Sequence, residues 1–209
     1  ILESFQADSL GRLEKLLKPF LVDLANFLFD LSTQVRQSSS DQNVFYDATI
    51  AIRRNLGPLS SDVVGQLKAL YLDPTPEQDQ EKLQAPTAEQ EGDLNLVDTA
   101  EFESSLALER MVNPGEELYR VPLEALVIRY ASLIDVDPNR VRLPIHMRPL
   151  CRAFQRTVSA QHYPAPVLLK VFEYFTRSFL QELKAYYHTL NQDLASQGVR
   201  PGLEQEISA

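Results

Sequence analysis

The sequence predicts an all-α protein, an irregular bundle of seven or eight helices packed around one long helix near the C-terminus. Apolar residues recur every three or four positions over most of the chain, as they do on the buried side of a helix. Glycine is scarce, at 7 of 209 residues, and tryptophan is absent. This composition favours helical over strand-rich architecture.

The broadest apolar stripe predicts the helix that organises the bundle, over residues 164–196. Pro164 and Pro166 fit its start, where a missing N–H costs little, and Gly198 fits the position just past its end. At 1.5 Å per residue, this helix is roughly 45 Å long. Its apolar residues are Leu168, Val171, Phe172, Phe175, Phe179, Leu183, Tyr186, Leu190 and Leu194.

The first 72 residues predict three helices. The first covers residues 3–36 and contains Pro19, which we expect to kink or break it. The second begins with Asp41 as its N-cap and is stopped by Gly57-Pro58. The third follows as far as residue 72, with a serine at position 60 or 61 as its cap.

The helical pattern stops at residues 73–96, which contain three prolines and almost no large apolar residue. We interpret this segment as an acidic linker or loop between an N-terminal helical part, 1–72, and a C-terminal helical part, 97–197. Residues 198–209 are expected to be a fraying tail. The stretch 73–109 holds one lysine and eleven acidic residues, so it carries nearly all of the net charge of −9.

Three further helices are predicted before the long one. Asp98 and Glu101 form a capping box for the first. A turn at 113–116 then starts a second helix, unless that helix begins near Val121. A proline-rich connector over 135–149 leads to the third, which runs from about Pro149 to residue 160.

Five arginines follow one another without an intervening acidic residue: Arg140, Arg142, Arg148, Arg152 and Arg156. The last three have helical i, i+4 spacing, which predicts one shared face. Guanidinium groups suit carboxylates and phosphates. Three roles are therefore open: pairing with the 73–109 segment or with Glu116, Glu117 and Glu124; a patch for a protein partner; or a site for an anionic nucleotide such as cyclic di-GMP. The spacing of Arg148 and Arg152 is similar to that of the cyclic di-GMP-binding PilZ domains, whose other signature residues and β-barrel are missing here.

Aromatic residues on the long helix cover more than one of its faces. Core packing explains most of them, and the excess could form a helix–helix interface with a second copy or another protein. The interface candidates are Tyr174, Tyr186 and Tyr187.

No catalytic residue, metal site or cofactor is predicted. The histidines at 146, 162 and 188 lack a neighbouring ligand at metal-binding spacing. Cys151, the single cysteine, is expected to be a buried, inert thiol and fits a reducing cytoplasm. The acidic composition disfavours nucleic-acid binding, and no apolar run reaches the roughly 20 residues of a membrane span.

Four stretches, LLKPFLVDLANFLFDLSTQVRQSSSDQNVFYDATIAIRRN, LNLVDTAEFESSLALERMVNPGEELYRVPLEALVIRY, PLCRAF and LNQDLASQGVRP, occur in this order. Together they resemble the bacterial "domain of unknown function 1631" family. The resemblance implies a helical module of a large cytoplasmic protein, in which a long variable region has shrunk to the 73–96 segment. It implies no activity and no functional residue. Some relatives bear a phosphorylase-like name, but a glycine-rich phosphate loop is missing here.

We therefore expect a non-enzymatic regulatory or protein-interaction helical module of a cytoplasmic bacterial protein, with its aromatic helix faces as the candidate surface for self-association. The alternative is a ligand-sensing domain that binds an anionic nucleotide through the arginines and regulates attached domains.

Overall fold

The computed structural model describes residues 1–34, 39–72 and 97–208, and over these ranges the protein is all-α without a strand. Taking 165–196 as one continuous helix, the described residues form eight helices and a short 3-10 turn. The elements are α1 (Leu2–Ser32), α2 (Ser39–Arg54), α3 (Leu56–Leu72), α4 (Val97–Leu118), α5 (Arg120–Ile134), η1 (Pro138–Arg140), α6 (Met147–Ser159), α7 (Ala165–Tyr174), η2 (Phe175–Phe179), α8 (Leu180–Ser196) and α9 (Leu203–Ser208).

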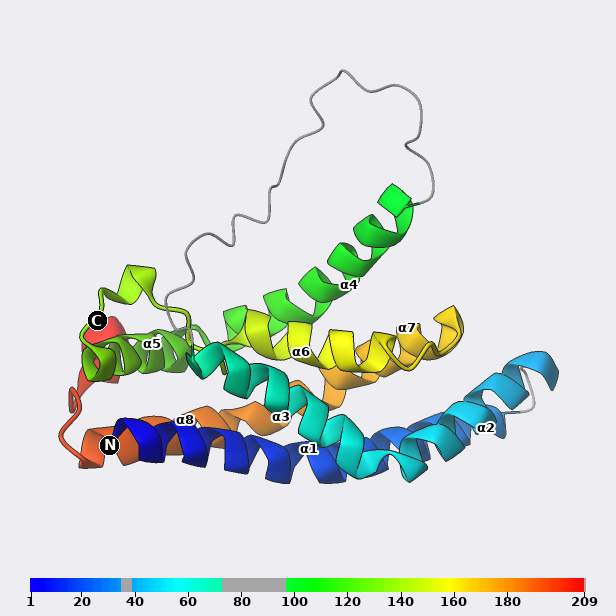
Figure 1. The fold of residues 1–209 in the computed structure, drawn as a ribbon, viewed down its shortest axis with the longest axis horizontal. Coiled ribbons are helices and arrows are strands. Elements are labelled where there is room, and N and C mark those ends of the chain that lie inside the picture. The colour runs from blue at the N-terminus through cyan, green and yellow to red at the C-terminus, as the bar shows by residue number, and fades with distance from the viewer. Residues whose placement is uncertain (35–38, 73–96, 209) are drawn as a thin grey trace, which may run out of the picture.

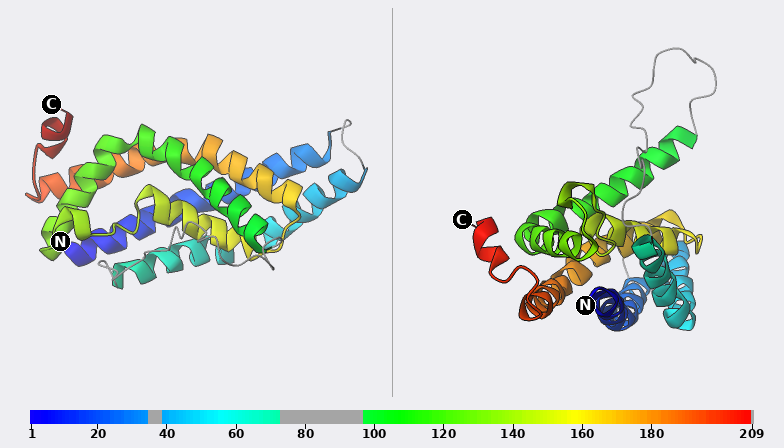
Figure 2. Two further views of the ribbon diagram at one scale, coloured as in Figure 1. Left: turned by 90° about the horizontal axis from the view of Figure 1, so that it is seen from above. Right: turned by 60° about the vertical axis from the view of Figure 1, so that its left-hand side comes forward.

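Helices α1 and α8 lie side by side along one side of the molecule, and α5, α6 and α7 lie above them (Figure 1). Helix α2 folds back along α1 as an antiparallel hairpin, and α3 then packs on both α1 and α6. The N-terminal half of α4 extends away from the body of the bundle (Figures 1 and 2). The arrangement leaves one side of the α1–α2 hairpin uncovered.

The long C-terminal helix is present, with a π-helical segment, η2, between α7 and α8. Within it the Leu180 N–H reaches the Phe175 carbonyl, five residues earlier. A π-turn inserts one extra residue and shifts the register of all that follows. Phe175 and Phe179 are both completely buried as a result, with ring centroids 5.0 Å apart. The width of the aromatic stripe in the sequence therefore follows from this change of register.

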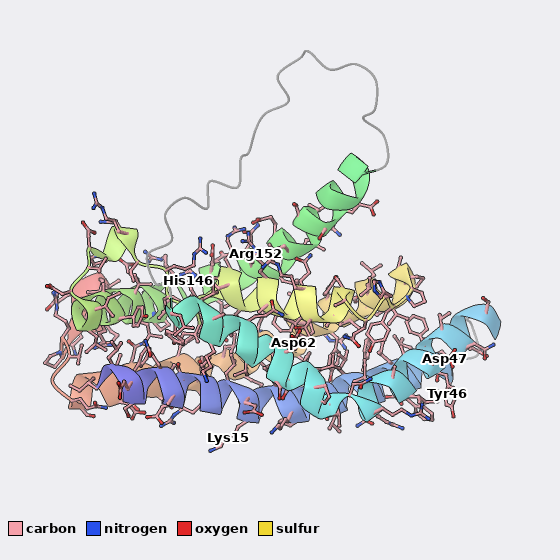
Figure 3. The ribbon with its side chains drawn as sticks, viewed as in Figure 1. Lys15, Tyr46, Asp47, Asp62, His146 and Arg152 are labelled. Atoms are coloured by element: carbon pink, nitrogen blue, oxygen red, sulfur yellow. The ribbon has the colours of Figure 1, made fainter. Side chains whose placement is uncertain are left out.

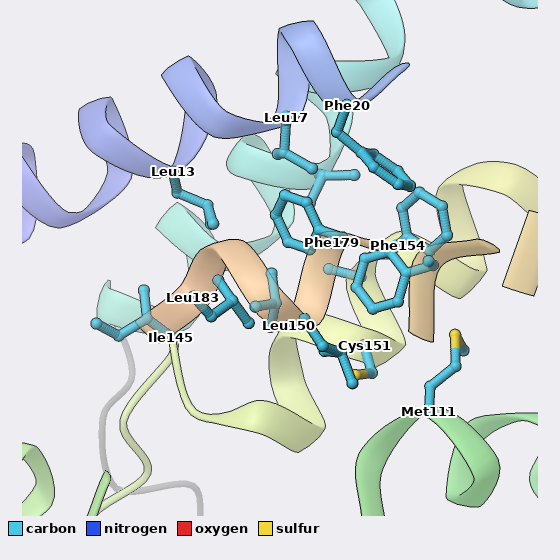
Figure 4. Packing of buried hydrophobic residues seen from close by; sticks show 14 of the residues in the cluster. Leu13, Leu17, Phe20, Met111, Ile145, Leu150, Cys151, Phe154, Phe179 and Leu183 are labelled. Carbon is cyan, nitrogen blue, oxygen red and sulfur yellow. The ribbon is translucent and has the colours of Figure 1, made fainter. Parts of the chain in front are cut away.

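The core is one hydrophobic cluster with members from both the 1–72 and the 97–197 parts of the chain. Figure 4 shows Leu13 and Leu17 of α1 facing Leu183 and Phe179 of the long helix. All four side chains are fully buried, and burial of each contributes about 1.5–3 kcal/mol. The division into two parts at 73–96 stays a prediction, because that segment lies outside the described residues.

Prolines do not end the helices where the sequence suggested. Pro19 is exposed and α1 continues through it, so the break predicted there is wrong. An exposed position lets water satisfy the carbonyl that the proline leaves without an N–H donor. Helix α2 ends at Arg54, and Gly57-Pro58 lies in the first turn of α3, where proline needs no N–H partner. Ser60 is consequently a buried helical residue, not a cap.

The turn predicted at 113–116 is also helical, because α4 runs without interruption to Leu118. Gly115 is buried where α6 begins, and a Cβ placed on it would lie 2.5 Å from the Met147 side chain. This glycine therefore permits close helix contact. The start of α5 at Arg120 agrees with the alternative start near Val121. The Tyr119 hydroxyl, at the junction, donates to the Leu180 carbonyl over 2.5 Å.

Gly198 ends α8 as predicted, with a left-handed φ of 84°. The Val199 N–H reaches the Leu194 carbonyl, and the Gly198 N–H reaches that of Ala195, which is the Schellman pattern. The residues beyond it, predicted to be a fraying tail, contain α9 and bury Leu203. Helix α2 begins at Ser39 and α4 at Val97, so Asp41 and Asp98 lie inside the first turns and are not the N-caps that the sequence predicted. None of the described helices has both the length and the apolar character needed to cross a membrane.

Candidate functional site

The arginine-rich helix α6 contacts α4 through a bidentate ion pair, and Figure 3 labels Arg152 between these two helices. Arg148 Nη1 donates to Glu109 Oε1 over 2.5 Å, and Nη2 donates to Oε2 over 3.0 Å. The hydrogen bond from Arg148 lowers the pKa of the Glu109 carboxyl, and the charge of Arg152 lowers it further. Glu109 belongs to the acidic 73–109 stretch, so pairing with that stretch is confirmed for Arg148.

The remaining arginines do not converge on this carboxylate. Arg140 is exposed on η1, Arg142 is half-buried in the connector that follows, and Arg156 is exposed near the end of α6. Arg148 and Arg156 are two helical turns apart, roughly 12 Å. The structure thus brings Arg148 and Arg152 together around Glu109 and leaves the other three spread along the chain.

A pocket of about 560 Å³ lies between α5, the end of α4 and the connector before α6. His146 lines it, with Nδ1 3.8 Å from Glu116 Oε1. Burial lowers the pKa of His146, Glu116 raises it, and Arg148 lowers it. The other lining residues are Arg120, Leu123, Glu124, Val127, Ile128, Pro138 and Asn139. Two carboxylates against one arginine make this a mixed polar pocket, poorly suited to an anion.

Two of the three tyrosines predicted at an interface are core residues. Tyr187 is completely buried and donates to the Ile145 carbonyl over 2.9 Å, and buried Tyr186 donates to the Ser9 carbonyl over 2.9 Å. Neither can reach a partner, which corrects the interface prediction in favour of core packing. Tyr174 is half-buried and stacks on Phe27 at a centroid distance of 4.6 Å.

Cys151 is buried as predicted, and burial raises the pKa of its thiol. Within the described ranges, no three His, Cys, Asp or Glu side chains gather in a way that could hold a metal ion.

An exposed apolar surface that the sequence did not predict lies on the α1–α2 hairpin. We call it the hairpin face and define it by Val22, Asn26 and Phe29 of α1 with Tyr46 and Arg53 of α2. Val22, Phe29 and Tyr46 are 42%, 38% and 49% exposed. The α1 members have i, i+4, i+7 spacing, so they share one side of that helix. Figure 3 shows Tyr46 on the outer side of α2.

Arg53 of α2 contacts two α1 residues of the hairpin face, Asn26 and Phe29. Its Nη2 donates to Asn26 Oδ1 over 3.0 Å, and its guanidinium lies 5.6 Å from the centroid of the Phe29 ring. An arginine stacked on an aromatic ring keeps its planar group in a fixed position. Asn26, Phe29 and Arg53 are therefore held in place by contacts within the hairpin.

A second feature missed from the sequence is Arg129 of α5, which is completely buried. All five guanidinium N–H groups have acceptors. Nε donates to the Val199 carbonyl, Nη1 to Asn191 Oδ1 and Glu204 Oε1, and Nη2 to the Arg200 carbonyl and Glu204 Oε2. The only signal in the sequence is an arginine beside Leu126 and Tyr130 on an apolar helix face.

Comparison with protein families gives a match to the N-terminal domain described as "Protein of unknown function (DUF1631)", over residues 1–198. The chain belongs to this family. Searches of curated proteins and of solved structures found no match. The resemblance seen in the sequence is thus confirmed for nearly the whole chain. The match includes Arg129, Asn191 and the hairpin face of this DUF1631 N-terminal domain, and it ends before α9.

Proposed function

We propose that this DUF1631 N-terminal domain is a non-enzymatic regulatory or protein-interaction module of a cytoplasmic bacterial protein, and that it self-associates through the hairpin face. The observation that carries the proposal is the exposed set Val22, Phe29 and Tyr46 around the fixed Arg53. Tyrosine, phenylalanine and arginine are enriched where proteins bind one another.

A second copy is the proposed occupant because the charges around the hairpin face are self-complementary. Arg53 and Arg54 of α2 are exposed, as are Asp30 of α1 and Asp47 of α2. In a two-fold symmetric dimer, the same surface of each copy forms the interface. Residue i of the first copy then contacts residue j of the second, and residue j of the first contacts residue i of the second. Basic and acidic groups on one face can then pair in both directions across the axis.

The face is small for a stable dimer. Two helices over about three turns each offer a few hundred Å² per copy, whereas standard interfaces bury roughly 800 Å² per partner. We therefore expect weak self-association, with a Kd in the micromolar range or above.

The alternative of an anionic-nucleotide sensor receives less support. Arg148 already bonds both oxygens of Glu109, and the nearby pocket carries the carboxylates of Glu116 and Glu124. An anion would have to displace the first carboxylate and tolerate the other two.

Light scattering across a concentration series tests the proposal. The average mass of the wild-type chain should rise with concentration, and Phe29→Glu or Tyr46→Glu should hold it at the monomer value. Leu169→Glu is the matched control, because Leu169 is 58% exposed on α7 and is not a member of the hairpin face. A wild-type chain that stays monomeric at the highest concentration, or an equal effect of all three variants, would refute self-association through this face.

A further inference from the structure

We propose that Arg129 and Asn191 form a peptide-binding site for a glutamate-containing segment, which residues 199–204 of this chain occupy in the structure. The site is built from α5 and α8, within the matched family domain. Its occupant begins just beyond the last matched residue, 198. The inference concerns a surface other than the hairpin face and does not depend on self-association.

Asn191 is fixed without help from the occupant. Asn191 is 2% exposed, and its Nδ2 donates to the Pro122 carbonyl over 2.9 Å and to the Tyr187 carbonyl over 3.1 Å. These bonds orient Asn191 Oδ1 toward Arg129. There Oδ1 accepts a hydrogen bond from Arg129 Nη1. The guanidinium is thereby held with its remaining N–H groups directed at the 199–204 segment.

The recognition chemistry combines a carboxylate, two main-chain carbonyls and two apolar side chains. Arg129 bonds both oxygens of Glu204, at 2.5 and 2.8 Å, and the carbonyls of Val199 and Arg200 at 3.1 and 3.0 Å. Val199 and Leu203 are buried beside it. The ligand class is therefore a short peptide with apolar residues four positions apart, followed directly by a glutamate.

Val199 caps α8 and belongs to the hydrophobic core, whereas among residues 200–208 only Leu203 is buried. Gly198, Arg200 and Gly202 all have positive φ, at 84°, 47° and 80°, and such a conformation is strained for arginine. Helix α9 has only six residues, of which Leu203 alone is buried. The Glu204 side chain is 38% exposed, so the carboxylate lies at the mouth of the site. The segment depends on the site for its shape, and its key group is reachable from solvent.

The test measures whether the same segment binds when it is supplied as a separate molecule. The probe is a fluorescein-labelled peptide of residues 197–209, QGVRPGLEQEISA, and the readout is fluorescence anisotropy. The receptor is the full chain with its own segment weakened, as Leu203→Asp or as Glu204→Gln. Wild type should bind at least tenfold more weakly than either variant, because its own segment competes at an effective concentration in the millimolar range.

The control changes the peptide and leaves the receptor as it is. A peptide with Glu204→Gln should bind the receptor variant about tenfold to a hundredfold more weakly, because it lacks the carboxylate that accepts two hydrogen bonds from Arg129. Equal binding of both peptides, or no binding to a folded receptor variant, would overturn the proposal. Unfolding of both receptor variants, measured by circular dichroism, would also overturn it, because the segment would then be a structural part of the domain.

The segment could come from the same chain or from a second copy that exchanges it. An exchanged dimer should survive Phe29→Glu and dissociate when excess peptide is added. A dimer formed through the hairpin face should do the opposite, so failure of one proposal can be told apart from failure of the other.

Discussion

Removal of the Tyr187 hydroxyl, which donates a hydrogen bond to the Ile145 carbonyl, should lower the free energy of unfolding by an amount that can be worked out from the structure. Tyr187 is completely buried, and its bond is 2.9 Å long. Tyr187→Phe keeps the ring and leaves a buried carbonyl without this donor. A neutral hydrogen bond contributes about 0.5–1.5 kcal/mol, and an unsatisfied buried acceptor adds to the loss. We expect the free energy of unfolding to fall by about 1.5 kcal/mol.

Tyr163 supplies the matched control. Its hydroxyl is also buried, but it has no hydrogen-bond partner among the described residues. Tyr163→Phe should therefore leave the free energy of unfolding unchanged or raise it by up to about 1 kcal/mol, since a buried unsatisfied hydroxyl is unfavourable.

Thermal and urea unfolding of the two variants measure the difference. For a chain of this size about 1 kcal/mol shifts Tm by roughly 2–4 °C, so Tyr187→Phe should lower Tm by about 3–6 °C. Tyr163→Phe should not lower it. An equal decrease in both variants would refute the reasoning, because the loss would then not arise from the Ile145 bond.

Two further predictions concern α4 and the pocket beside it. Gly115→Ala should lower the free energy of unfolding by about 1–3 kcal/mol, because its Cβ would meet the methionine side chain that begins α6 at 2.5 Å. Gly57→Ala, where the added Cβ meets nothing within 4 Å, should raise it by up to about 1 kcal/mol in the same urea titration. Burial lowers the folded-state pKa of His146 more than Glu116 raises it, with Arg148 adding to the decrease. The unfolded chain therefore binds the proton more readily, so stability should fall as the pH drops below about 6.5, and His146→Gln should reduce this dependence.

The sequence predicted those features that depend on local periodicity. The apolar spacing between Leu168 and Leu194 indicated the long helix, and Gly198 marked its end at the correct residue. Pro164 and Pro166 lie at the start of the long helix as predicted. The breaks inferred at Pro19 and at Gly57-Pro58 failed because proline breaks a helix only where its missing N–H is needed. Pro19 is exposed, and Pro58 lies in a first turn, so neither position required that donor.

The candidate sites depend on contacts between residues far apart in the chain, and these were not predictable. Arg129 and Glu204 are 75 positions apart, and no local pattern joins them. The hairpin face requires knowing which sides of α1 and α2 remain uncovered once α3 and α8 have packed. Tyr186 and Tyr187 were assigned to an interface because the π-turn that directs them into the core has no recognised signature in the sequence.

The central claim, self-association through the hairpin face, is tested most directly by cross-linking at a single introduced cysteine. The native thiol, Cys151, is buried with a raised pKa, so it should not react with a short bismaleimide. We predict that Asp47→Cys gives a covalent dimer, that added Phe29→Glu abolishes it, and that Leu169→Cys gives none. Equal cross-linking at positions 47 and 169, or a dimer at 47 that persists with Phe29→Glu, would contradict the account.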